Sequence, residues 1–337
     1  MTFAPKSIEP CQAAGPVAER RAATRHICVF VLPGANMLDF TALIEPLRVL
    51  NQIKLSVEYT WSVVSETGAP APCSNGMSVP VDGALPETRR SDVIVVCSGE
   101  KHYLGAGAKA LQWLRRHARF GGDIVALSTG AFTLARAGLV DDRPVTLHWS
   151  KIPVFQEMFP LIECEATRLS RNGLSGSGAG GGSSLELALS MIEKDFDPST
   201  AQNVAEHCLF DFDPRANRPQ RRSVSTLIGT RHPAILNILQ KMEQSIENPV
   251  TLNELMDDEQ ISRRQLERLF TKHLKTSPAR HYRHMRLDRA RTLLWETDLP
   301  IAEIAVATGF GTMTNFARLY RSRFGSRPTD DRKAQSA

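Results

Sequence analysis

The sequence contains few cysteines and no long hydrophobic run, and these absences exclude several classes of protein. Its six cysteines stand far apart and form no Cys-x-x-Cys pair, so they indicate neither a zinc site nor a disulfide framework. No apolar run approaches the roughly 18 residues that a membrane helix needs. We therefore expect a cytoplasmic protein with reduced thiols, no membrane partner, no metal and no cofactor.

The first 24 residues also lack an apolar segment. Pro5, Glu9, Pro10, Arg20 and Arg21 are spread along them, whereas a secretory signal peptide needs a continuous hydrophobic stretch. Residues 1–24 are therefore predicted to form a flexible tail.

The rest of the composition is typical of a folded protein with two domains. The chain has 337 residues, of which 42% are hydrophobic and 23% are charged. Its formal net charge of +5 is unevenly distributed: residues 1–230 hold 23 basic and 23 acidic side chains, whereas residues 261–337 hold 16 basic and 7 acidic ones. This local excess favours a polyanion as the partner of the C-terminal part, although a solvated basic surface would produce the same count.

Residues 25–210 alternate between strand-like and helix-like segments. Short β-branched runs occupy residues 26–32, 59–65, 92–99 and 123–130. Amphipathic segments occupy residues 39–51, 105–119, 131–138 and 183–195. This alternation predicts βαβ units in a flavodoxin-like α/β domain, whose mainly parallel sheet is covered by helices on both faces. In such sheets, ligands bind at the carboxyl ends of the strands.

The C-terminal part shows a different pattern, with helices only. Residues 211–230 are polar and contain prolines, so they are predicted to be a linker. Residues 231–332 follow as an all-α domain. Its predicted helices have apolar residues at i, i+3 and i+4 spacing and span residues 232–247, 252–259, 263–273, 279–297, 301–307 and 313–323.

The helical part contains an internal repeat with an offset of 49 to 50 residues. Leu-x-Arg-x-Phe at 266–270 matches Phe-x-Arg-x-Tyr at 316–320. Each copy consists of a short helix, a turn, and a second helix with arginine on one face and Leu or Phe on the other. This is the layout of a helix-turn-helix unit.

The second helix of each copy carries polar side chains suited to base edges and arginines suited to phosphates. The candidate DNA-binding residues are Ser262, Arg263, Arg264, Gln265 and Arg268 in the first copy, and Thr312, Thr314, Asn315, Arg318 and Arg321 in the second. On the joining helix, Arg283, Arg286 and Arg289 form a stripe that would also face DNA. Taken singly, each arginine is equally well explained as a solvated charge.

Three segments closely resemble the DNA-binding domain of AraC/XylS-type transcription regulators: SRRQLERLF, SPARHYRHMRLDRARTLL and IAEIAVATGFGTMTNFARLYRSRFGSRP. The resemblance covers about residues 232–332. It implies that two helix-turn-helix units enter adjacent major grooves of double-stranded DNA, with RNA polymerase as a further partner. The first unit departs from the second, because Met256 stands where the second has Ala305, and Gln260 where it has Gly309. We therefore expect the first unit to be looser or to prefer different bases.

The α/β part carries a possible nucleophilic site. Ser128, in ALSTGAF, follows a strand and opens a helix, as in a nucleophile elbow; His148 lies 20 positions further on, and Asp39 follows the first strand. A serine hydrolase is one interpretation. Against it stand the chain order of the three residues and Ala126, which replaces the first glycine of the elbow. The alternative is that Ser128 and Asp39 cap helices and His148 is a hydrogen-bonding core residue.

The segments LPGANMLDFTALIEPLRVL, STGAFTLARAGLVDDRPVTLHW and SGAGGGSSLELALSMI resemble the class I glutamine amidotransferase-like (PfpI-type) domain. In particular, they resemble the subgroup fused to AraC-type helices, whose members respond to arginine, carnitine or glycine betaine. PfpI-type enzymes have a cysteine nucleophile at the position of Ser128, with an acidic residue and a histidine at the positions of Asp39 and His148. A serine lacks the low-pKa thiolate of that cysteine, so the resemblance implies that catalysis is lost and the pocket retained.

The retained pocket is expected to bind a small-molecule effector. The candidate ligand-binding residues are Asp39, Ser128, Thr129, His148, Trp149, Ser177 and Gly180. The glycine-rich loop at 176–184 opens a helix whose N–H groups suit a carboxylate, and Asp39 or Trp149 suits a cationic amine. A tight turn between strand and helix would explain the glycines equally well.

These observations predict a sequence-specific DNA-binding transcription regulator that is controlled by a small, nitrogenous metabolite and is not an enzyme. The resemblance further implies a homodimer formed through the α/β domain. Two other hypotheses remain open. One is a PfpI-type or serine hydrolase with an appended helical domain, and the other is a constitutive DNA-binding protein whose cleft is filled.

Overall fold

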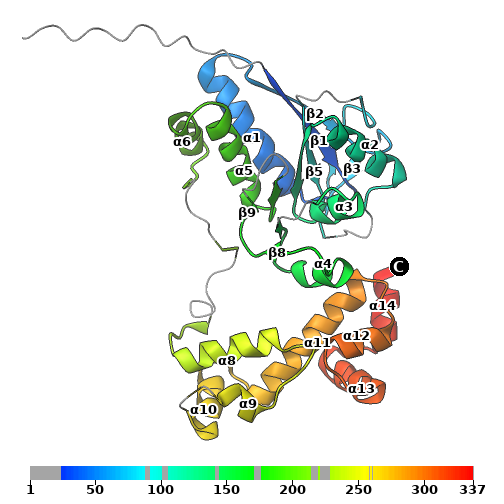
Figure 1. The fold of residues 1–337 in the computed structure, drawn as a ribbon, viewed down its shortest axis with the longest axis vertical. Helices are drawn as coiled ribbons and strands as arrows, with labels where there is room; N and C mark the ends of the chain where they lie inside the picture. The colour runs from blue at the N-terminus through cyan, green and yellow to red at the C-terminus, as the bar shows by residue number, and fades with distance from the viewer. Residues whose placement is uncertain are drawn as a thin grey trace, which may run out of the picture.

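The computed structural model describes residues 24–87, 92–100, 105–140, 144–170, 176–213, 219–220, 228–257, 259 and 261–336. An α/β domain with a mainly parallel sheet comes first in the chain, and a helical domain follows it (Figure 1). The predicted fold class is confirmed. The predicted tail, residues 1–24, lies outside the described residues except for Thr24.

The main sheet has six strands in the order β2-β1-β5-β6-β10-β9. Every neighbouring pair is parallel except β9 and β10, which are antiparallel. The four long strands match the four β-branched runs predicted from the sequence. The strands are β1 (Arg25–Val31), β2 (Tyr59–Val64), β5 (Val93–Cys97), β6 (Asp123–Leu127), β9 (Leu169–Ser170) and β10 (Ser177–Gly178).

Helices cover both faces of this sheet, because alternate side chains of a strand point to opposite faces. Ile27, Val29 and Val31 of β1 belong to the core beneath α1 (Met37–Lys54), α5 (Ser183–Asp195) and α6 (Pro198–His207). Cys28 and Phe30 belong to the opposite core, beneath α2 (Ala108–Arg119) and α3 (Gly130–Arg136). Helices α1, α2, α3 and α5 were predicted from the sequence, whereas α6 was not.

The described part of the α/β domain also contains four two-residue strands and one short helix outside the main sheet, and none of them was predicted. They are β3 (Ala71–Pro72), which pairs with β4 (Ser78–Val79), β7 (Val145–Thr146), which pairs with β8 (Cys164–Glu165), and α4 (Ile152–Met158). With two residues per strand, such pairs show no periodicity that a sequence could reveal.

The helical domain consists of two helix-turn-helix units joined by one long helix. The units are α9–α10 and α12–α13, and α11 joins them. The helices are α8 (Pro233–Gln244), α9 (Leu252–Met256), α10 (Arg263–Leu274), α11 (Pro278–Glu296), α12 (Ile301–Ala307), α13 (Met313–Phe324) and α14 (Pro328–Ser336). Capping boxes begin α9 at Thr251 and α10 at Ser262.

The two units differ in ways that bear on the expected looseness of the first. Helix α9 has five residues and α12 has seven. Met256 is half-buried in the first unit, whereas Ala305 is buried in the second. Gln260 lies outside the described residues, so its effect on the first turn stays a prediction.

The second unit shares a core with the α/β domain. Val154 and Phe155 of α4 belong to the same buried cluster as Leu287, Leu293 and other residues of α11. Figure 1 shows α4 lying against α11 at the boundary between the two domains. The first unit instead has a separate core, formed by α8, α9, α10 and part of α11.

A buried ion pair lies in this interdomain contact. The ammonium Nζ of Lys151 is 2.6 Å from Oε1 of Glu296, and the two side chains are only 10% and 14% exposed. Removing one partner of such a pair leaves an uncompensated buried charge, so the pair favours one relative placement of α4 and α11.

The turn of the second unit depends on Gly309, which has a φ of +72°. A Cβ at this position would collide with Pro249 and lie 2.8 Å from the carbonyl oxygen of Glu247, both of which belong to the connection between α8 and α9. Gly309 therefore allows both a left-handed turn and a close contact between the two halves of the helical domain.

We predict that Gly309→Ala lowers the free energy of unfolding by about 2–4 kcal/mol, because strain at positive φ adds to overpacking against Pro249. Gly311→Ala is the matched control, since a Cβ there meets nothing within 4 Å. Thermal unfolding of the full chain, followed by circular dichroism, measures both. Equal midpoints for the two variants would contradict the role given to Gly309.

Candidate functional site

Ser128 lies in a sharp turn between β6 and α3, as the sequence predicted. Its φ of +55° is in the left-handed region, which side chains other than glycine rarely adopt. Its N–H donates to the carbonyl oxygen of Gly178 at 2.9 Å. A Cβ on Gly130, two residues later, would lie 2.6 Å from the carbonyl oxygen of Val96, so a glycine lets α3 begin directly against β5. This is the geometry of a nucleophile elbow.

Asp39 lies directly behind the glycine-rich loop, close to Ser128. A Cβ on Gly180 would be 2.7 Å from Cβ of Ser128 and 2.8 Å from Oδ2 of Asp39, so only a glycine fits between them. The Asp39 carboxylate is fully buried, and its Oδ1 accepts a hydrogen bond from the Gly181 N–H. Its Oδ2 has no partner among the described residues. Burial raises the pKa of Asp39 to about 7, although the Gly181 N–H lowers it.

His148 follows β7 and reaches the same region. Its Nδ1 lies 2.8 Å from the hydroxyl of Ser150, and the Trp149 ring lies beside it at 5.4 Å between centroids. Burial, followed by the ammonium group of Lys151, lowers the pKa of His148. The ring is therefore neutral at pH 7.

These elements surround a cavity of about 310 Å³ at the carboxyl end of the sheet. The described residues that line it are Asn36, Ser128, His148, Trp149, Arg168, Ala179, Gly180, Gly181, Gly182, Ser183 and Gln220. Of the candidate ligand-binding residues, the structure thus brings Ser128, His148, Trp149 and Gly180 together at one cavity.

The other three candidates lie behind the cavity wall. Asp39 is covered by the glycine loop. The hydroxyl of Thr129 is buried and donates to Ser98 Oγ at 2.9 Å, and the hydroxyl of Ser177 accepts from the Thr146 N–H at 2.8 Å. Both hydroxyls therefore bond to neighbouring segments of the α/β domain, and neither residue lines the cavity, which the sequence pattern did not indicate.

Sequence reasoning missed three cavity residues. Asn36 caps α1, with its Oδ1 accepting from the Leu38 N–H, and the PfpI-like motif that contains it was a usable signal. Arg168 donates to Glu186 of α5 at 2.7 Å. Gln220 comes from the segment predicted to be a linker. No motif marks Arg168 or Gln220.

The arrangement favours binding over nucleophilic attack. An activated serine needs a base within about 3 Å of its hydroxyl. Among the described residues, no hydrogen bond joins the Ser128 hydroxyl to His148 or Asp39, and Nδ1 of His148 is directed to Ser150. The cavity offers instead a guanidinium group, hydroxyls and the N-terminus of the 13-residue helix α5, all suited to an anion.

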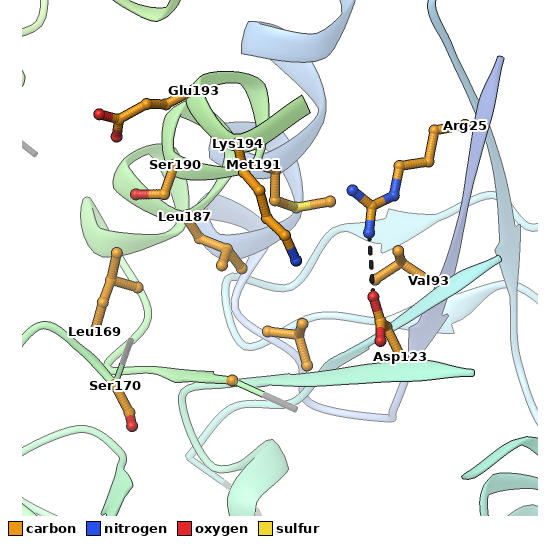
Figure 2. Close-up of a pocket in the computed structure, with 12 residues that line it drawn as sticks. Arg25, Val93, Asp123, Leu169, Ser170, Leu187, Ser190, Met191, Glu193 and Lys194 are labelled. Carbon is orange, nitrogen blue, oxygen red and sulfur yellow. Dashed lines mark hydrogen bonds and ion pairs between the residues drawn. The ribbon is translucent and has the colours of Figure 1, made fainter. Parts of the chain in front are cut away.

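A second cavity, of about 260 Å³, lies at the opposite end of the strands and contains none of the candidate residues. Figure 2 shows Asp123, at the start of β6, paired with Arg25 at 3.1 Å on one side of this cavity. Leu187 and Met191 of α5 lie on the other side.

The ten candidate DNA-binding residues are all exposed. Helices α10 and α13, which carry most of them, lie on the side of the helical domain away from the α/β domain (Figure 1). Helix α11 between the units has 19 residues and is therefore about 28 Å long, close to the roughly 34 Å of one turn of duplex. The second helices of the two helix-turn-helix units, α10 and α13, thus lie on the same side of the helical domain (Figure 1).

Local hydrogen bonds modify the roles of some candidates. Ser262 and Gln265 form a capping box, in which the Gln265 amide oxygen accepts from the Ser262 N–H at 2.7 Å. Thr312 caps α13, and Arg318 donates to Asn315 at 2.9 Å. The amide oxygens of Gln265 and Asn315 are therefore engaged before any base is contacted.

The arginine stripe predicted on α11 is wrong in two of its three positions. Arg283 is exposed, but Arg286 is half-buried and donates to the carbonyl oxygens of Thr308 and Gly309. Its guanidinium also lies over the Phe310 ring at 4.3 Å. Burial lowers the pKa of Arg289, which faces Glu243 and Glu157. Periodicity placed these arginines on one face of α11, but that face is half-buried against other parts of the protein at Arg286 and Arg289 and is exposed only at Arg283.

We predict that Asp39 makes the folded state less stable as pH rises. The unfolded chain ionises Asp39 near pH 4, whereas the folded chain keeps it protonated up to about pH 7, so unfolding releases a proton in between. Between pH 5 and pH 8 this lowers the unfolding free energy by about 3 kcal/mol.

Asp39→Asn retains the acceptor for the Gly181 N–H but cannot ionise. Thermal melts of both proteins from pH 5 to pH 8 should show that the melting temperature falls more steeply with pH in the parent than in the variant. Parallel profiles would contradict the raised pKa of Asp39.

Comparisons with known proteins agree with this geometry. Residues 25–193 match the DJ-1/PfpI family, and residues 255–334 match a helix-turn-helix domain. The HTH-type transcriptional regulator CdhR of Pseudomonas aeruginosa is 38% identical over 303 residues, which cover 90% of each chain. GbdR, an HTH-type transcriptional regulator of the same organism, is 31% identical over 305 residues, covering 90% of this chain and 83% of GbdR.

A solved structure of a ThiJ/PfpI family protein from Pseudomonas syringae shares the fold, with a TM-score of 0.50 and 18% identity over 71% of this chain and 93% of that one. No helix in the described part of the chain is both long and apolar enough to cross a membrane. The family match to residues 25–193 and the similarity to CdhR over 90% of the chain agree with both predicted resemblances, to the PfpI-type domain and to the AraC-type regulators. The chain therefore belongs to the AraC-type helix-turn-helix transcriptional regulators that carry an N-terminal DJ-1/PfpI domain.

Proposed function

We propose that this regulator binds a small metabolite in the 310 Å³ cavity and changes its action on DNA in response. The observation that carries the proposal is the cavity itself, which retains an elbow at Ser128 but in which no described residue acts as a hydrogen-bonded base on the serine hydroxyl. In this proposal the α/β domain is a sensor without turnover. Such a cavity is large enough for a ligand of amino-acid size.

The polar groups of the cavity suggest the chemistry of one end of the ligand. Arg168 is the only arginine or lysine among the described lining residues, and one N–H of its guanidinium is already paired with Glu186 of α5 at 2.7 Å, so its other N–H groups are the ones offered to a ligand. The Gly182 N–H at the start of α5 has no acceptor in the described chain. A carboxylate placed here would receive charge-assisted hydrogen bonds and the favourable end of the helix dipole.

The Trp149 ring at the cavity suggests the chemistry of the other end of the ligand. The Trp149 ring is 40% exposed and lies beside His148 at the cavity. The face of a tryptophan attracts a cationic amine, most of all when the amine is alkylated and weakly hydrated. A compact zwitterion with a carboxylate and an ammonium group therefore fits best. The resemblance to fused regulators that respond to arginine, carnitine and glycine betaine makes these three compounds the first to test.

We predict that at least one of L-carnitine, glycine betaine and L-arginine raises the melting temperature of the full chain. A ligand at 100 times its dissociation constant adds about 2.7 kcal/mol to the folded state. Arg168→Ala should weaken binding at least about tenfold, because one charge-assisted hydrogen bond contributes about 1.5–3 kcal/mol.

Arg48→Ala is the matched control, since Arg48 is an exposed arginine of α1 paired only with neighbours on its own helix. Calorimetric titration of parent and variants gives the affinities. If none of the three compounds shifts the parent, the proposed ligand class is wrong. Turnover of an ester or amide substrate that disappears in Ser128→Ala would overturn the sensor without catalysis.

The helical domain is the DNA-binding part of this proposal. Arg264, Arg268 and Arg321 have no ion pair or hydrogen bond within the described chain, so their guanidinium groups remain available for phosphates or guanine. The proposal also retains a cytoplasmic homodimer that contacts RNA polymerase. Its direct target is a promoter with two half-sites about one duplex turn apart.

We predict that Arg318→Ala weakens binding to a duplex selected from random sequence by the parent protein. Arg264→Ala should cost about 1–3 kcal/mol and relax preference at one base pair. Arg48→Ala again serves as the control. Mobility-shift titrations over a range of salt concentrations separate loss of a phosphate contact from loss of base preference. Unchanged affinity and preference in both variants would show that α10 and α13 are not the DNA-contacting helices.

A further inference from the structure

The segment between the two domains is attached to the α/β domain at one described point. Pro219 forms an antiparallel bridge with Thr167, and the Gln220 N–H donates to the carbonyl oxygen of Ala166 at 3.2 Å. Both partners directly follow β8. Pro219 and Gln220 therefore pair with the two residues that continue the chain from β8.

The side chain of Gln220 makes three more hydrogen bonds. Its Nε2 donates to the carbonyl oxygens of Leu147 at 2.8 Å and Thr167 at 2.7 Å, and its Oε1 accepts from the Trp149 N–H at 2.7 Å. Both amide N–H groups and the amide oxygen are thus used. A primary amide is the side chain that can donate twice and accept once at such a junction.

Gln220 also lines the cavity proposed for the effector, together with His148 and Trp149. The wall of this cavity is therefore completed by a residue that belongs neither to the PfpI-like domain nor to the helix-turn-helix units. A ligand bound in this cavity would therefore be able to contact Gln220 itself, without any intermediate chain of residues.

The turn that Gln220 holds is tied to the helical domain at its other end. The Lys151 N–H donates to the carbonyl oxygen of His148 at 2.8 Å, closing a turn from His148 to Lys151. Lys151 then pairs with Glu296 at the end of α11. One four-residue turn thus connects the cavity, the interdomain segment and the helix that joins the two DNA-binding units.

We propose that Gln220 is an effector-contacting residue and also the latch that holds the interdomain segment on the α/β domain, so that cavity occupancy and segment docking stabilise each other. The ligand part of this inference rests on the proposed sensor function. A ligand that contacts Gln220 binds the docked state more tightly than the undocked one, and this differential affinity is what shifts the population. Because coupling is reciprocal, weakening the latch lowers ligand affinity by the factor by which the ligand strengthens docking.

Limited proteolysis of the full chain tests the latch without any ligand. The segment contains Arg215, Arg221 and Arg222, and trypsin cuts after each of them. Gln220→Ala removes the three side-chain hydrogen bonds and should speed cleavage in this segment about tenfold. Gln220→Glu keeps the size of the side chain but turns a carboxylate oxygen toward two carbonyl oxygens. This variant should therefore be cut at least as fast as Gln220→Ala.

Gln202→Ala is the matched control, since Gln202 is an exposed glutamine of α6, and it should be cut at the parent rate. Mass spectrometry of the fragments identifies the bond that is cut. Cleavage of both Gln220 variants at the parent rate would overturn the latch.

The ligand arm repeats the experiment with L-carnitine, glycine betaine or L-arginine. A compound that binds the parent should slow cleavage of the parent and bind Gln220→Ala several-fold more weakly in a calorimetric titration. Equal affinity of parent and variant would overturn the coupling. If no compound binds the parent, the ligand class of the proposed function fails, whereas the ligand-free cleavage rates still decide whether Gln220 is the latch.

Discussion

The parallel pairing of β1, β5 and β6 is the constraint on which the rest of the α/β domain depends. In parallel pairing the carboxyl ends of all three strands meet at one edge, and whatever follows each strand gathers there. Asn36 and Asp39 follow β1, Ser98 follows β5, and Ser128 follows β6. The elbow at Ser128 and the glycines at 180–182 then decide which of these groups reach the cavity and which are buried behind it.

The position of the α/β domain relative to the helix-turn-helix units depends on a shared core. Side chains of α4 and α11 pack in one buried cluster, and the Lys151–Glu296 pair lies within this contact. Such a contact is costly to rearrange, because separating the pair leaves a charge in an apolar setting. The second helix-turn-helix unit is therefore more directly connected to the α/β domain than the first, whose core is separate.

The surroundings of Ser128 agree with the loss of catalysis expected when serine replaces the cysteine nucleophile of a PfpI-type enzyme. In a PfpI-type enzyme the elbow would present a thiolate, but here it presents a hydroxyl to which no base is hydrogen-bonded in the described part of the chain. Burial also keeps Asp39 protonated up to about pH 7, so it is a poor partner for a cation at lower pH. Under the proposed function, the groups available to a ligand are Arg168, the glycine-loop amides and the Trp149 ring, a set that would suit a zwitterion.

Local patterns in the sequence were enough for the main elements and for the family. Short β-branched runs predicted the four long strands, and amphipathic spacing predicted most helices, because these signals arise between residues close in the chain. Only tertiary packing decided that Arg286 and Arg289 face protein, that the hydroxyls of Thr129 and Ser177 bond to neighbouring segments of the α/β domain, and that Arg168 and Gln220 line the cavity. Each of these roles depends on a partner distant in sequence, which periodicity and composition do not encode.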